Sequence, residues 1–432
     1  MSLDEPTRPI RMHESLLPKE HSLHRPRHSS RQRTAFTCAV AFFLVPALAF
    51  VLGARPHQIE NHKLASFPSI ADGFGFFQKL NGWATDNLPL RDAGIHAESG
   101  ISNGLFGEPP PYSQNERSSG TGPIGPVSSP ADPREESGAD GFPKVIRGKD
   151  GWLYFGYDMQ GKCQPVQPLA STIAALNRLR RAVTASGRKF VLVVGPDKST
   201  VIPQHLPDSY AGKTCAAPYQ KKFWQRITTL AGAIDVRGDL HAASKKAGMP
   251  TYYKKDTHWN NIGVTTMLRA LAEDIQPGVT RTWRVTRGAL TTGPADLPPM
   301  LGGRATNRGH MYQLAPDGGV DRARDAGVLN FLHPYRPKGA AVPGAIQPKT
   351  ALLGDSFLLA GARYLPAVFG NCTAYYYSAA ANNPAQLDQI IRGSKIVVLE
   401  VVERNLAAGI VQFLSPGSLA QLIAYLASHP MP

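Results

Sequence analysis

Several patterns that identify common protein classes are missing from the 432-residue chain. It contains no internal repeat, so a repeat architecture is not expected. No basic run is interleaved with aromatic residues, and the sequence therefore predicts no nucleic-acid partner. The histidines near the N-terminus have no cysteine or carboxylate at the spacing of a metal site, and no metal or other cofactor is predicted. The chain is nevertheless long enough for a sizeable core in one or two domains.

Acidic residues are scarce in one part of the chain. Residues 1–143 carry 13 basic and 15 acidic side chains, whereas residues 144–432 carry 34 basic and 17 acidic ones. The C-terminal part therefore has an excess of 17 positive charges. Such a surface attracts polyanions, among them acidic glycans and anionic lipid headgroups, although a basic surface can also serve solubility alone.

One long segment carries no charge. Residues 34–54, TAFTCAVAFFLVPALAFVLGA, are 21 residues without a charged side chain. A helix of this length reaches about 30 Å, the thickness of a bilayer core. The basic residues before it favour a cytoplasmic N-terminus. The sequence predicts an uncleaved transmembrane signal anchor over 34–54 and a cytoplasmic basic tail over 1–33. Cleavage as a signal peptide is the alternative.

The four cysteines have different surroundings. Cys163 and Cys215 lie in polar, turn-rich stretches and form a candidate disulfide in an oxidising compartment, although sequence alone does not fix the pairing. Cys38 falls inside the uncharged segment. Cys372 starts an expected buried strand and is expected to be a free core thiol.

Composition divides the rest of the chain. Residues 55–108 have nearly helical apolar spacing and are predicted to form a membrane-proximal helical lead-in. Residues 109–143 are rich in Pro, Gly and Ser and are predicted to be a linker. Residues 144–432 are predicted to be one domain.

Strand-like and helix-like segments alternate in this last region. KFVLVVGP, KTALLGD, CTAYYYS and KIVVLEVV are predicted strands, KVIRGKDGWLYFG a hairpin, and PTYYKK a strand or extended segment. NIGVTTMLRALAEDI and FLLAGARYLPAVFG are among the predicted helices. The alternation predicts an α/β fold with a mostly parallel sheet flanked by helices. Sites in such sheets form at the carboxyl ends of strands.

Two segments at such ends carry the residues of a nucleophilic site. In LLGDSFLLA, Ser356 follows a predicted strand, where a turn can project a nucleophile. In YYKKDTHWNNIG, Asp256 and His258 are two residues apart, so in extended backbone they share a face. A carboxylate there can orient an imidazole whose other nitrogen reaches a serine. The sequence predicts a Ser356–His258–Asp256 triad.

Other readings of these residues are simpler. A Gly-Asp-Ser tripeptide often marks only a turn, and Asp256 could cap the following helix, although Asn260 or Asn261 would serve as well. Asp-x-His also opens some metallophosphoesterase sites. Those need further ligands, and no Gly-Asn-His follows here, so this reading is disfavoured.

The motifs GKDGWLYFG, GPDKSTVIPQHLP, KKDTHWNNIG, ADLPPMLG, LLGDSF and VVLEVVERNL occur in the order of the AlgJ/AlgX group of alginate O-acetyltransferases. The sequence resembles that group over roughly residues 60–108 and 144–410, and it resembles AlgJ more than AlgX because no C-terminal carbohydrate-binding module is evident. The resemblance implies an SGNH-hydrolase-like domain with Ser356 as nucleophile, His258 as general base and Asp256 as its orienting acid.

The resemblance also implies partners and a location. It implies a single-pass inner-membrane protein whose catalytic domain lies on the periplasmic side and moves acetyl groups onto an exported polysaccharide. The donor would be a multipass membrane O-acyltransferase.

Further residues are candidates for the oxyanion hole or for substrate binding. The turn of Gly354 and Asp355 is a candidate for the oxyanion hole or substrate binding, with the Ser356 amide as one donor. Lys198, in the family's Pro-x-Lys turn, contacts substrate or has a structural role. Arg404 and Asn405 lie near the site, unless Arg404 instead forms a salt bridge with Glu400 or Glu403.

Two other functions stay open. An esterase of the same fold would use the same triad, because water and a sugar hydroxyl are both acceptors. A non-catalytic glycan-binding assembly protein would keep only a vestigial site.

Overall fold

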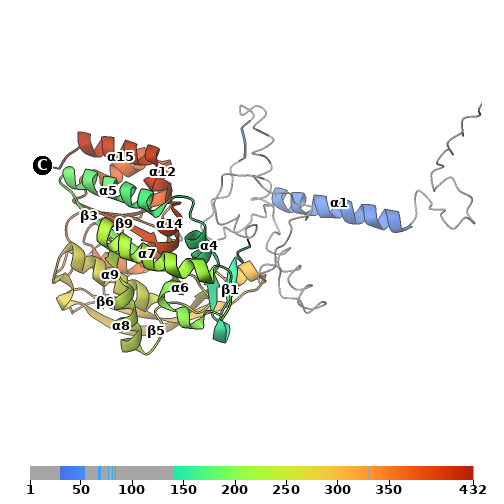
Figure 1. Cartoon of the computed structure of the whole chain (residues 1–432), viewed down its shortest axis with the longest axis horizontal. Helices are drawn as coiled ribbons and strands as arrows, with labels where there is room; N and C mark the ends of the chain where they lie inside the picture. The colour runs from blue at the N-terminus through green and yellow to red at the C-terminus, as the bar shows by residue number, and fades with distance from the viewer. Residues whose placement is uncertain are drawn as a thin grey trace, which may run out of the picture. The chain divides into compact units, whose positions relative to one another are not determined.

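The computed structural model describes residues 30–53, 67–69, 76, 80, 83 and 141–431, except 329 and 340 (Figure 1). The chain divides into two units, and residues 30–53 and 141–431 fall in different ones. Most of the predicted tail over 1–33, of the lead-in over 55–108 and of the linker over 109–143 lies outside the described residues. These three assignments therefore stay predictions.

The first unit contains one long helix. α1 spans Ser30–Val51 and includes most of the uncharged segment. Cys38 in this helix is an exposed free thiol. Within the described parts of the chain, no helix meets the combined requirement of length and hydrophobicity for crossing a membrane.

The second unit is built on a five-stranded sheet in the order β4-β3-β9-β7-β8. Every pairing in it is parallel. The predicted α/β fold with a mostly parallel sheet is confirmed. The strands are β3 (Lys189–Gly195), β4 (Ile234–Asp235), β7 (Thr350–Gly354), β8 (Cys372–Tyr376) and β9 (Ile396–Val402).

Helices cover both faces of the sheet, so its strands are almost uniformly apolar. Leu192, Leu353 and Leu399 point to one face and pack against α5, α7, α13 and α15. Their sequence neighbours Val193, Leu352 and Val398 point to the other face, toward α8, α9 and α11. Cys372 at the start of β8 is a buried free thiol.

The helices of this unit have the following bounds: α4 (Tyr157–Cys163), α5 (Leu169–Ala185), α6 (Lys198–Val201), α7 (Lys213–Ala231), α8 (Arg237–Ala247), α9 (Asn261–Ile275), α10 (Ser356–Leu359), α11 (Leu365–Val368), α12 (Tyr377–Asn382), α13 (Pro384–Ile391), α14 (Glu403–Ala408) and α15 (Pro416–Ser428). In Figure 1, α5 and α15 lie side by side at one end of the view, and α8 and α9 lie toward the other.

Two small antiparallel ribbons flank the sheet. β1 (Val145–Arg147) and β2 (Leu153–Phe155) form the predicted hairpin around Lys-Asp-Gly. Asp150 there has φ of 55°, a left-handed conformation that Asp tolerates better than most residues. β5 (Arg284–Pro294) and β6 (Thr306–Ala315) form a longer ribbon, which we call the β5–β6 ribbon.

Of the two options for PTYYKK, the structure excludes the strand, since Tyr252 makes only an isolated bridge with Trp259 before the chain turns toward α9. One local prediction is wrong. The helix expected over residues 357–370 is broken into α10, a short helical turn at Ala362–Tyr364, and α11. Gly361 and Pro366 interrupt the helical pattern there, and both are unfavourable in helix interiors.

A disulfide ties two helices together. Cys163, at the end of α4, is bonded to Cys215, near the start of α7, 52 residues later. The bond therefore closes a loop that contains α5, β3 and α6, and it restricts the unfolded chain more than a short loop would.

We expect a Cys163→Ala/Cys215→Ala double variant to lose about 2–4 kcal/mol of unfolding free energy, because the unfolded state regains the entropy of the open loop. Urea unfolding followed by tryptophan fluorescence measures this loss. Cys38→Ala, which removes an exposed free thiol, is the control and should leave the midpoint unchanged. Equal midpoints for the double variant and the wild type under oxidising conditions would contradict the prediction.

Candidate active site

Ser356 stands where β7 leaves the sheet. Gly354 ends the strand, Asp355 caps the next helix by accepting a hydrogen bond from the Phe357 amide at 2.9 Å, and Ser356 is the first residue of α10. A Cβ on Gly354 would come within 2.5 Å of the Leu358 side chain. The turn therefore requires glycine, and it leaves the partly exposed Ser356 at the carboxyl edge of the sheet.

His258 lies on the loop before α9. Asn260 is the cap of that helix, since its side chain accepts from the amides of Ile262 at 3.0 Å and Gly263 at 3.3 Å. Asp256 is therefore not the helix cap that the simpler reading allowed. Its carboxylate turns back toward the His258 ring instead.

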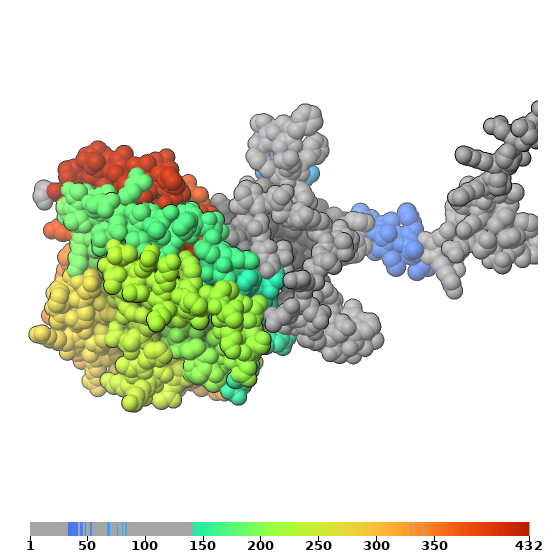
Figure 2. Space-filling model, viewed as in Figure 1, coloured from blue at the N-terminus to red at the C-terminus, as the bar shows by residue number. Residues whose placement is uncertain are grey.

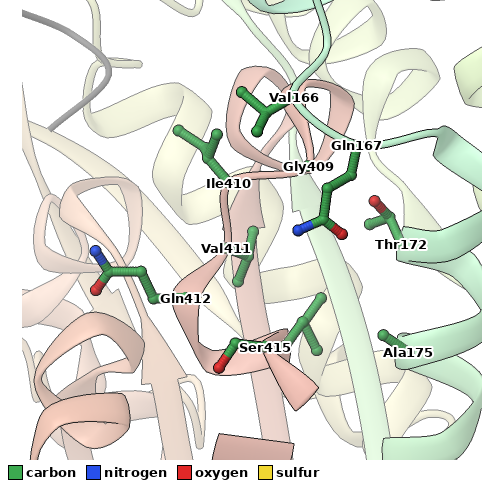
Figure 3. Close-up of a pocket in the computed structure, with 10 residues that line it drawn as sticks. Val166, Gln167, Thr172, Ala175, Gly409, Ile410, Val411, Gln412 and Ser415 are labelled. Atoms are coloured by element: carbon green, nitrogen blue, oxygen red, sulfur yellow. The ribbon is translucent and has the colours of Figure 1, made fainter. Parts of the chain in front are cut away.

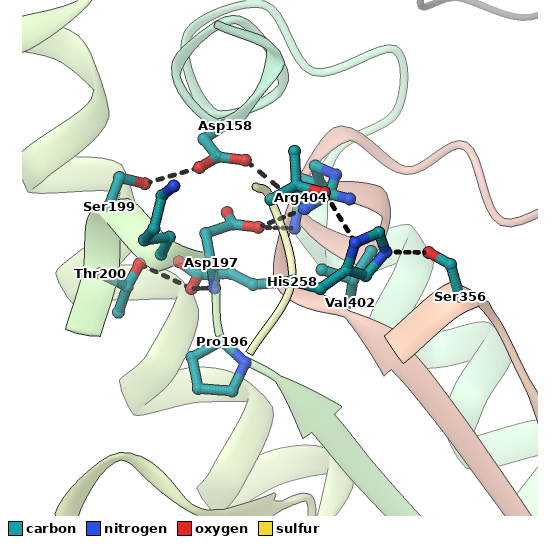
Figure 4. A network of polar contacts seen from close by, with 12 residues as sticks. Asp158, Pro196, Asp197, Ser199, Thr200, His258, Ser356, Val402 and Arg404 are labelled. Atoms are coloured by element: carbon teal, nitrogen blue, oxygen red, sulfur yellow. Dashed lines mark hydrogen bonds and ion pairs between the residues drawn. The ribbon is translucent and has the colours of Figure 1, made fainter. Parts of the chain in front are cut away.

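The three predicted residues form one chain of hydrogen bonds, which Figure 4 shows in part. His258 Nε2 lies 2.8 Å from Ser356 Oγ, and His258 Nδ1 lies 2.8 Å from Asp256 Oδ1. With Nδ1 protonated toward the carboxylate, Nε2 is free to accept the serine proton. This is the geometry that a nucleophile, a base and an orienting acid require.

Asp256 is held on every side. Its Oδ1 also accepts the His258 amide at 3.0 Å, and its Oδ2 accepts the Asn307 side chain at 2.7 Å and the Asp296 amide at 3.2 Å. Burial alone would raise the pKa of Asp256, but the bonds from His258 and Asn307 hold it below its ordinary value. The carboxylate therefore stays charged and fixed in position.

A second carboxylate, Asp296, faces the same ring nitrogen. Asp296 Oδ2 lies 3.3 Å from His258 Nδ1, and its other oxygen accepts the Thr257 amide at 2.8 Å. The Thr257 hydroxyl also donates to Asp296. Asp296 belongs to the ADLPPMLG motif, 40 residues after Asp256. Sequence spacing over that distance does not show that Asp296 contacts the His258 ring, so the sequence analysis missed it.

The two carboxylates change the basicity of His258. Burial would lower its pKa, but hydrogen bonds and charge from Asp256 and Asp296 raise it to about 10. The imidazolium that forms when Ser356 loses its proton is therefore strongly stabilised. The same effect favours the protonated ring, so the neutral form, in which Nε2 can accept the serine proton, becomes more abundant as the pH rises.

A cleft of about 370 Å³ opens over these residues. The β5–β6 ribbon forms one wall of it, and the loop before α9 and the start of α10 form the others. The lining residues are Tyr253, Asp256, His258, Trp259, Asn260, Asn261, Thr291, Thr292, Gly293, Pro294, Asn307, Ser356, Leu359 and Ala360.

Lys198 lies behind the cleft and does not line it. Its buried ammonium donates to the backbone carbonyls of Tyr253 at 3.2 Å, Lys254 at 3.4 Å and Asp256. Burial lowers its pKa to about 8, against the opposing charges of Asp296 and Asp256. Of the two roles considered for Lys198, these contacts favour the structural one, in which it holds the loop that carries His258.

Arg404 and Asn405 also lie behind the site. The ion pairs that the structure shows for Arg404 are with Asp197 at 3.3 Å and Asp158 at 3.5 Å, two carboxylates other than the Glu400 and Glu403 of the alternative reading. Its guanidinium also covers the Phe357 ring at 5.3 Å. The Asn405 side chain donates to the Tyr377 hydroxyl at 2.9 Å, and that hydroxyl donates to Asp355 at 3.4 Å. Both residues support the Ser356 turn from behind.

The backbone amides of the Ser356 turn donate hydrogen bonds to different partners. Gly354 pairs with Tyr376 in the sheet, and the Asp355 amide donates to Glu400 Oε2 at 3.1 Å. Burial and the Asp355 charge raise the pKa of Glu400 well above its ordinary value, which favours the neutral form of this carboxyl. Of the turn's donors, Asp355 and Phe357 are thus committed to carboxyl oxygens.

A buried ionic network extends from this region (Figure 4). Lys162 Nζ lies 2.5 Å from Asp197 and 3.1 Å from Glu403, and Ser199 donates to Asp158 at 3.0 Å. Burial and the charge of Asp197 raise the pKa of Asp158 to about 7. With Arg404, the network joins α4, the end of β3 and α14, and it fixes the sheet edge beneath the cleft.

The carboxylates around His258 could also suit a cation. One ligand atom each from Asp256, His258 and Asp296 lie within 4.8 Å of one another. The Nδ1 atom that would bind a metal is the atom that faces Asp256 at 2.8 Å. The oxygen donors fit a divalent ion, but an ion there would displace the hydrogen bond that orients the ring.

A second cavity, of about 220 Å³, lies beside the start of α5 (Figure 3). Val166, Gln167 and Thr172 face Ile410, Val411 and Gln412 across it. Its lining contains no ionisable side chain and shares no residue with the Ser356 cleft. It therefore offers no base for a nucleophile.

We expect the His258 ring to titrate near pH 10 and, in Asp296→Asn, about 1–3 pH units lower, because one of its two carboxylate partners is lost. NMR titration of the imidazole protons in the full-length chain measures both values. Asp274→Asn, a change on the exposed end of α9, is the control. A midpoint near the ordinary histidine value of about 6.5 in the wild type would show that the carboxylates do not act as described.

Comparison with known proteins gives the family. Residues 145–358 match the family model for the SGNH hydrolase-like domain of acetyltransferase AlgX. The probable alginate O-acetylase AlgJ of Pseudomonas syringae pv. tomato is 29% identical over 136 residues, which are 32% of this chain and 34% of that protein. AlgJ of Pseudomonas putida is 26% identical over 181 residues, 41% of this chain and 43% of that protein. The chain thus spans less than half the length of the curated relatives it matches.

Solved structures give related matches. The O-acetyltransferase domain of Pseudomonas putida AlgJ matches with a TM-score of 0.43 and 17% identity, over 65% of this chain and 99% of that one. Pseudomonas aeruginosa AlgX matches with a TM-score of 0.38 and 16% identity, over 62% and 65%. The family-model match to residues 145–358 and the curated relatives support an AlgJ/AlgX-like family for this chain, with an SGNH hydrolase-like fold.

Proposed function

We propose that the chain is an O-acetyltransferase that moves acetyl groups onto hydroxyls of a polysaccharide through an acetyl-Ser356 intermediate. The observation that carries the proposal is the unbroken hydrogen-bond chain from Ser356 through His258 to Asp256, open to a cleft. The AlgJ relatives, named as probable alginate O-acetylases, support acetyl as the group and a polysaccharide as the acceptor.

The first half-reaction forms the acetyl-enzyme. His258 Nε2 takes the proton of Ser356 Oγ while the oxygen attacks the acetyl carbonyl of the donor. Asp256 and Asp296 stabilise the imidazolium. The bond from the acetyl carbon to the donor then breaks, and the imidazolium returns the proton to the leaving group. Ser356 carries the acetyl ester, and His258 is neutral again.

The second half-reaction uses the same groups in reverse. A sugar hydroxyl loses its proton to His258 Nε2 and attacks the acetyl-Ser356 carbonyl. The new ester forms on the sugar, and His258 returns the proton to Ser356 Oγ. The developing oxyanion needs donors, and we assign one to the Ser356 amide, because its neighbours at Asp355 and Phe357 are already bonded to carboxyl oxygens.

We also propose that residues 34–54 anchor the chain in the inner membrane, with residues 141–431 on the periplasmic side. The support is the uncharged sequence and the basic residues before it. The Cys163–Cys215 disulfide favours an oxidising compartment. Acetyl-CoA does not occur there, so a multipass membrane O-acyltransferase is the proposed donor.

An esterase is the second candidate. The His258 side chain is 25% exposed, and Ser356 is partly exposed as well, so water can reach an acetyl-Ser356. This exposure favours either catalytic function over a binding protein with a vestigial site, because such a protein has no need for a serine that substrate can reach.

We expect Ser356→Ala to lower cleavage of a chromogenic acetyl ester by at least about a thousandfold, because no covalent intermediate can form. The full-length chain is assayed with and without candidate glycans, and the products are analysed for acetylated sugar and free acetate. Ser171→Ala, an exposed serine on α5, is the matched control.

Acetyl on the glycan that disappears in Ser356→Ala supports the transferase. Free acetate as the only product, whatever glycan is offered, would establish the esterase. Equal turnover by wild type and Ser356→Ala, or none by either, would contradict a catalytic Ser356.

A further inference from the structure

Two pairs of consecutive residues meet at the Ser356 site. His258 Nε2 lies 2.8 Å from Ser356 Oγ. Trp259, the next residue after His258, donates its indole N–H at 3.1 Å to the carbonyl of Phe357, the next residue after Ser356. The hydrogen bond between the second members of the two pairs therefore lies one residue along the chain from the contact between base and nucleophile.

The Phe357 carbonyl is available to the indole because α10 is short. In a continuing α-helix, the amide of Gly361 would donate to the Phe357 carbonyl four residues before it. The Gly361 amide donates instead to the Leu358 carbonyl at 2.8 Å, where α10 ends. The Phe357 carbonyl thus loses its helical donor, and the indole of Trp259 takes that donor's place.

Packing leaves the indole ring little freedom. Trp259 is buried, and its ring lies edge-to-face on the Phe357 ring with centroids 4.9 Å apart. A Cβ added to Gly263 would come within 2.6 Å of Trp259 Cβ, and one added to Gly195 would come within 3.4 Å of the indole ring. These two glycines make room for the indole, and its N–H therefore has a fixed position.

The Trp259–Phe357 hydrogen bond joins the two segments that carry the reacting groups. Ser356 and His258 come from different parts of the chain, so α10 and the loop before α9 must be held at a fixed separation. The carboxylate contacts of His258 orient its ring, and the carboxyl contacts of the Ser356 turn hold that turn on the sheet. Each of these sets acts on one segment, whereas the indole bond ties one segment directly to the other.

We propose that Trp259 is a positioning residue, whose indole N–H sets the distance between His258 Nε2 and Ser356 Oγ by holding the carbonyl next to the nucleophile. Transfer of the serine proton requires hydrogen-bond contact between these two atoms. A displacement of about 1 Å at a reacting centre can slow a reaction about a hundredfold. The inference rests on the proposed function in that it concerns the rate at which Ser356 is activated.

A role in packing alone is the simpler explanation of a buried tryptophan, and it predicts the opposite order for two substitutions. Phenylalanine keeps an apolar ring but removes the N–H donor. Histidine fills less of the space, but its five-membered ring matches that of indole and can place Nε2–H where the indole N–H lies. If the donor matters, Trp259→His is the more active variant. If packing alone matters, Trp259→Phe is the more active one.

The test measures the reactivity of Ser356, which requires neither the natural donor nor an acceptor. Full-length wild type, Trp259→Phe and Trp259→His are treated with phenylmethylsulfonyl fluoride, and sulfonylation of Ser356 is followed over time by mass spectrometry. The kcat and KM for the chromogenic acetyl ester are measured in parallel. Circular dichroism verifies that each variant is folded, and NMR follows the titration of the His258 ring.

Trp224→Phe is the matched control. Trp224 belongs to α7, which lies at the front of Figure 2 in yellow-green, and it packs in the core on the opposite face of the sheet from Trp259. The Trp224 indole nitrogen is buried and has no hydrogen-bond partner among the residues that the structure describes. The control therefore removes the same ring volume without removing a hydrogen bond.

We expect Trp259→Phe to be sulfonylated about a hundredfold more slowly than wild type and to lose kcat by a similar factor, with little change in KM. Trp259→His should react at least about tenfold faster than Trp259→Phe, and Trp224→Phe should react as wild type does. The His258 ring should still titrate near pH 10 in Trp259→Phe, because both of its carboxylate partners remain. General disorder of the loop would not leave that titration unchanged.

Three results would overturn the inference: equal reactivity of Trp259→Phe and wild type, a Trp259→Phe variant at least as reactive as Trp259→His, or an equal loss in Trp224→Phe. If Trp259→Phe does not fold, Trp259→His is compared with wild type directly, and a loss of more than about tenfold there would overturn the inference. A wild-type Ser356 that does not react with the reagent would overturn the proposed function as well. A reactive Ser356 whose rate does not depend on Trp259 would overturn the inference alone, so the two failures are distinguishable.

Discussion

The site depends on how one ammonium group holds one loop. Lys198, the first residue of α6 after β3, donates to three backbone carbonyls of the segment that leads to His258. The Lys254 carbonyl also accepts the Leu153 amide at 3.0 Å. The carbonyls of Tyr253 and Asp256 depend on Lys198, and a buried carbonyl left without its partner costs about 1–3 kcal/mol. The three hydrogen bonds from Lys198 fix the position of Asp256. Asp256 in turn orients the His258 ring.

Lys198 can hold the His258 loop because the turn that carries Lys198 is itself fixed by ion pairs. The turn after β3 contains Asp197, which pairs with Lys162 and Arg404. A buried ion pair contributes little net stability, but removal of one partner leaves a charge that the interior cannot solvate. The network is therefore better understood as a device that sets the relative positions of α4, β3 and α14 than as a source of stability. The Ser356 turn and the His258 loop both pack against these three elements.

The sequence predicted the parts whose signal is local. KFVLVVGP and KIVVLEVV are apolar on both faces, which only a parallel sheet covered on both sides requires, and NIGVTTMLRALAEDI matches α9. The β5–β6 ribbon could not be predicted in the same way. β5 is exposed on both faces, so it lacks the apolar alternation that identifies a strand, and Gly288, Gly293 and Pro294 interrupt it.

Contacts between residues far apart in sequence also limited how much of the site could be predicted. Asp256 and His258 are two residues apart, and their spacing alone predicts a shared face. Asp296 and Asn307 reach the same carboxylate and ring from 40 and 51 residues away, because the ribbon folds back over the loop. A salt bridge with Glu400 or Glu403 was one of two alternatives for Arg404. The ion pairs that the structure shows for it are with Asp197, which follows the neighbouring strand β3, and with Asp158 on α4.

Ser356 is partly exposed, so the binding of the acceptor decides whether the acetyl group goes to a sugar or to water. Water reaches the same carbonyl of acetyl-Ser356 that a sugar hydroxyl must attack, and water is always present at high concentration. A hydroxyl held in position reacts as if it were at an effective concentration of about 10⁵–10⁸ M, which exceeds that of water by orders of magnitude. The triad is therefore the same in a transferase and an esterase, and the groups that hold the acceptor decide between them. The β5–β6 ribbon contributes Thr291, Thr292, Gly293, Pro294 and Asn307 to the lining of the cleft. Changes in the ribbon would therefore alter what the cleft can hold and leave Ser356, His258 and Asp256 unchanged.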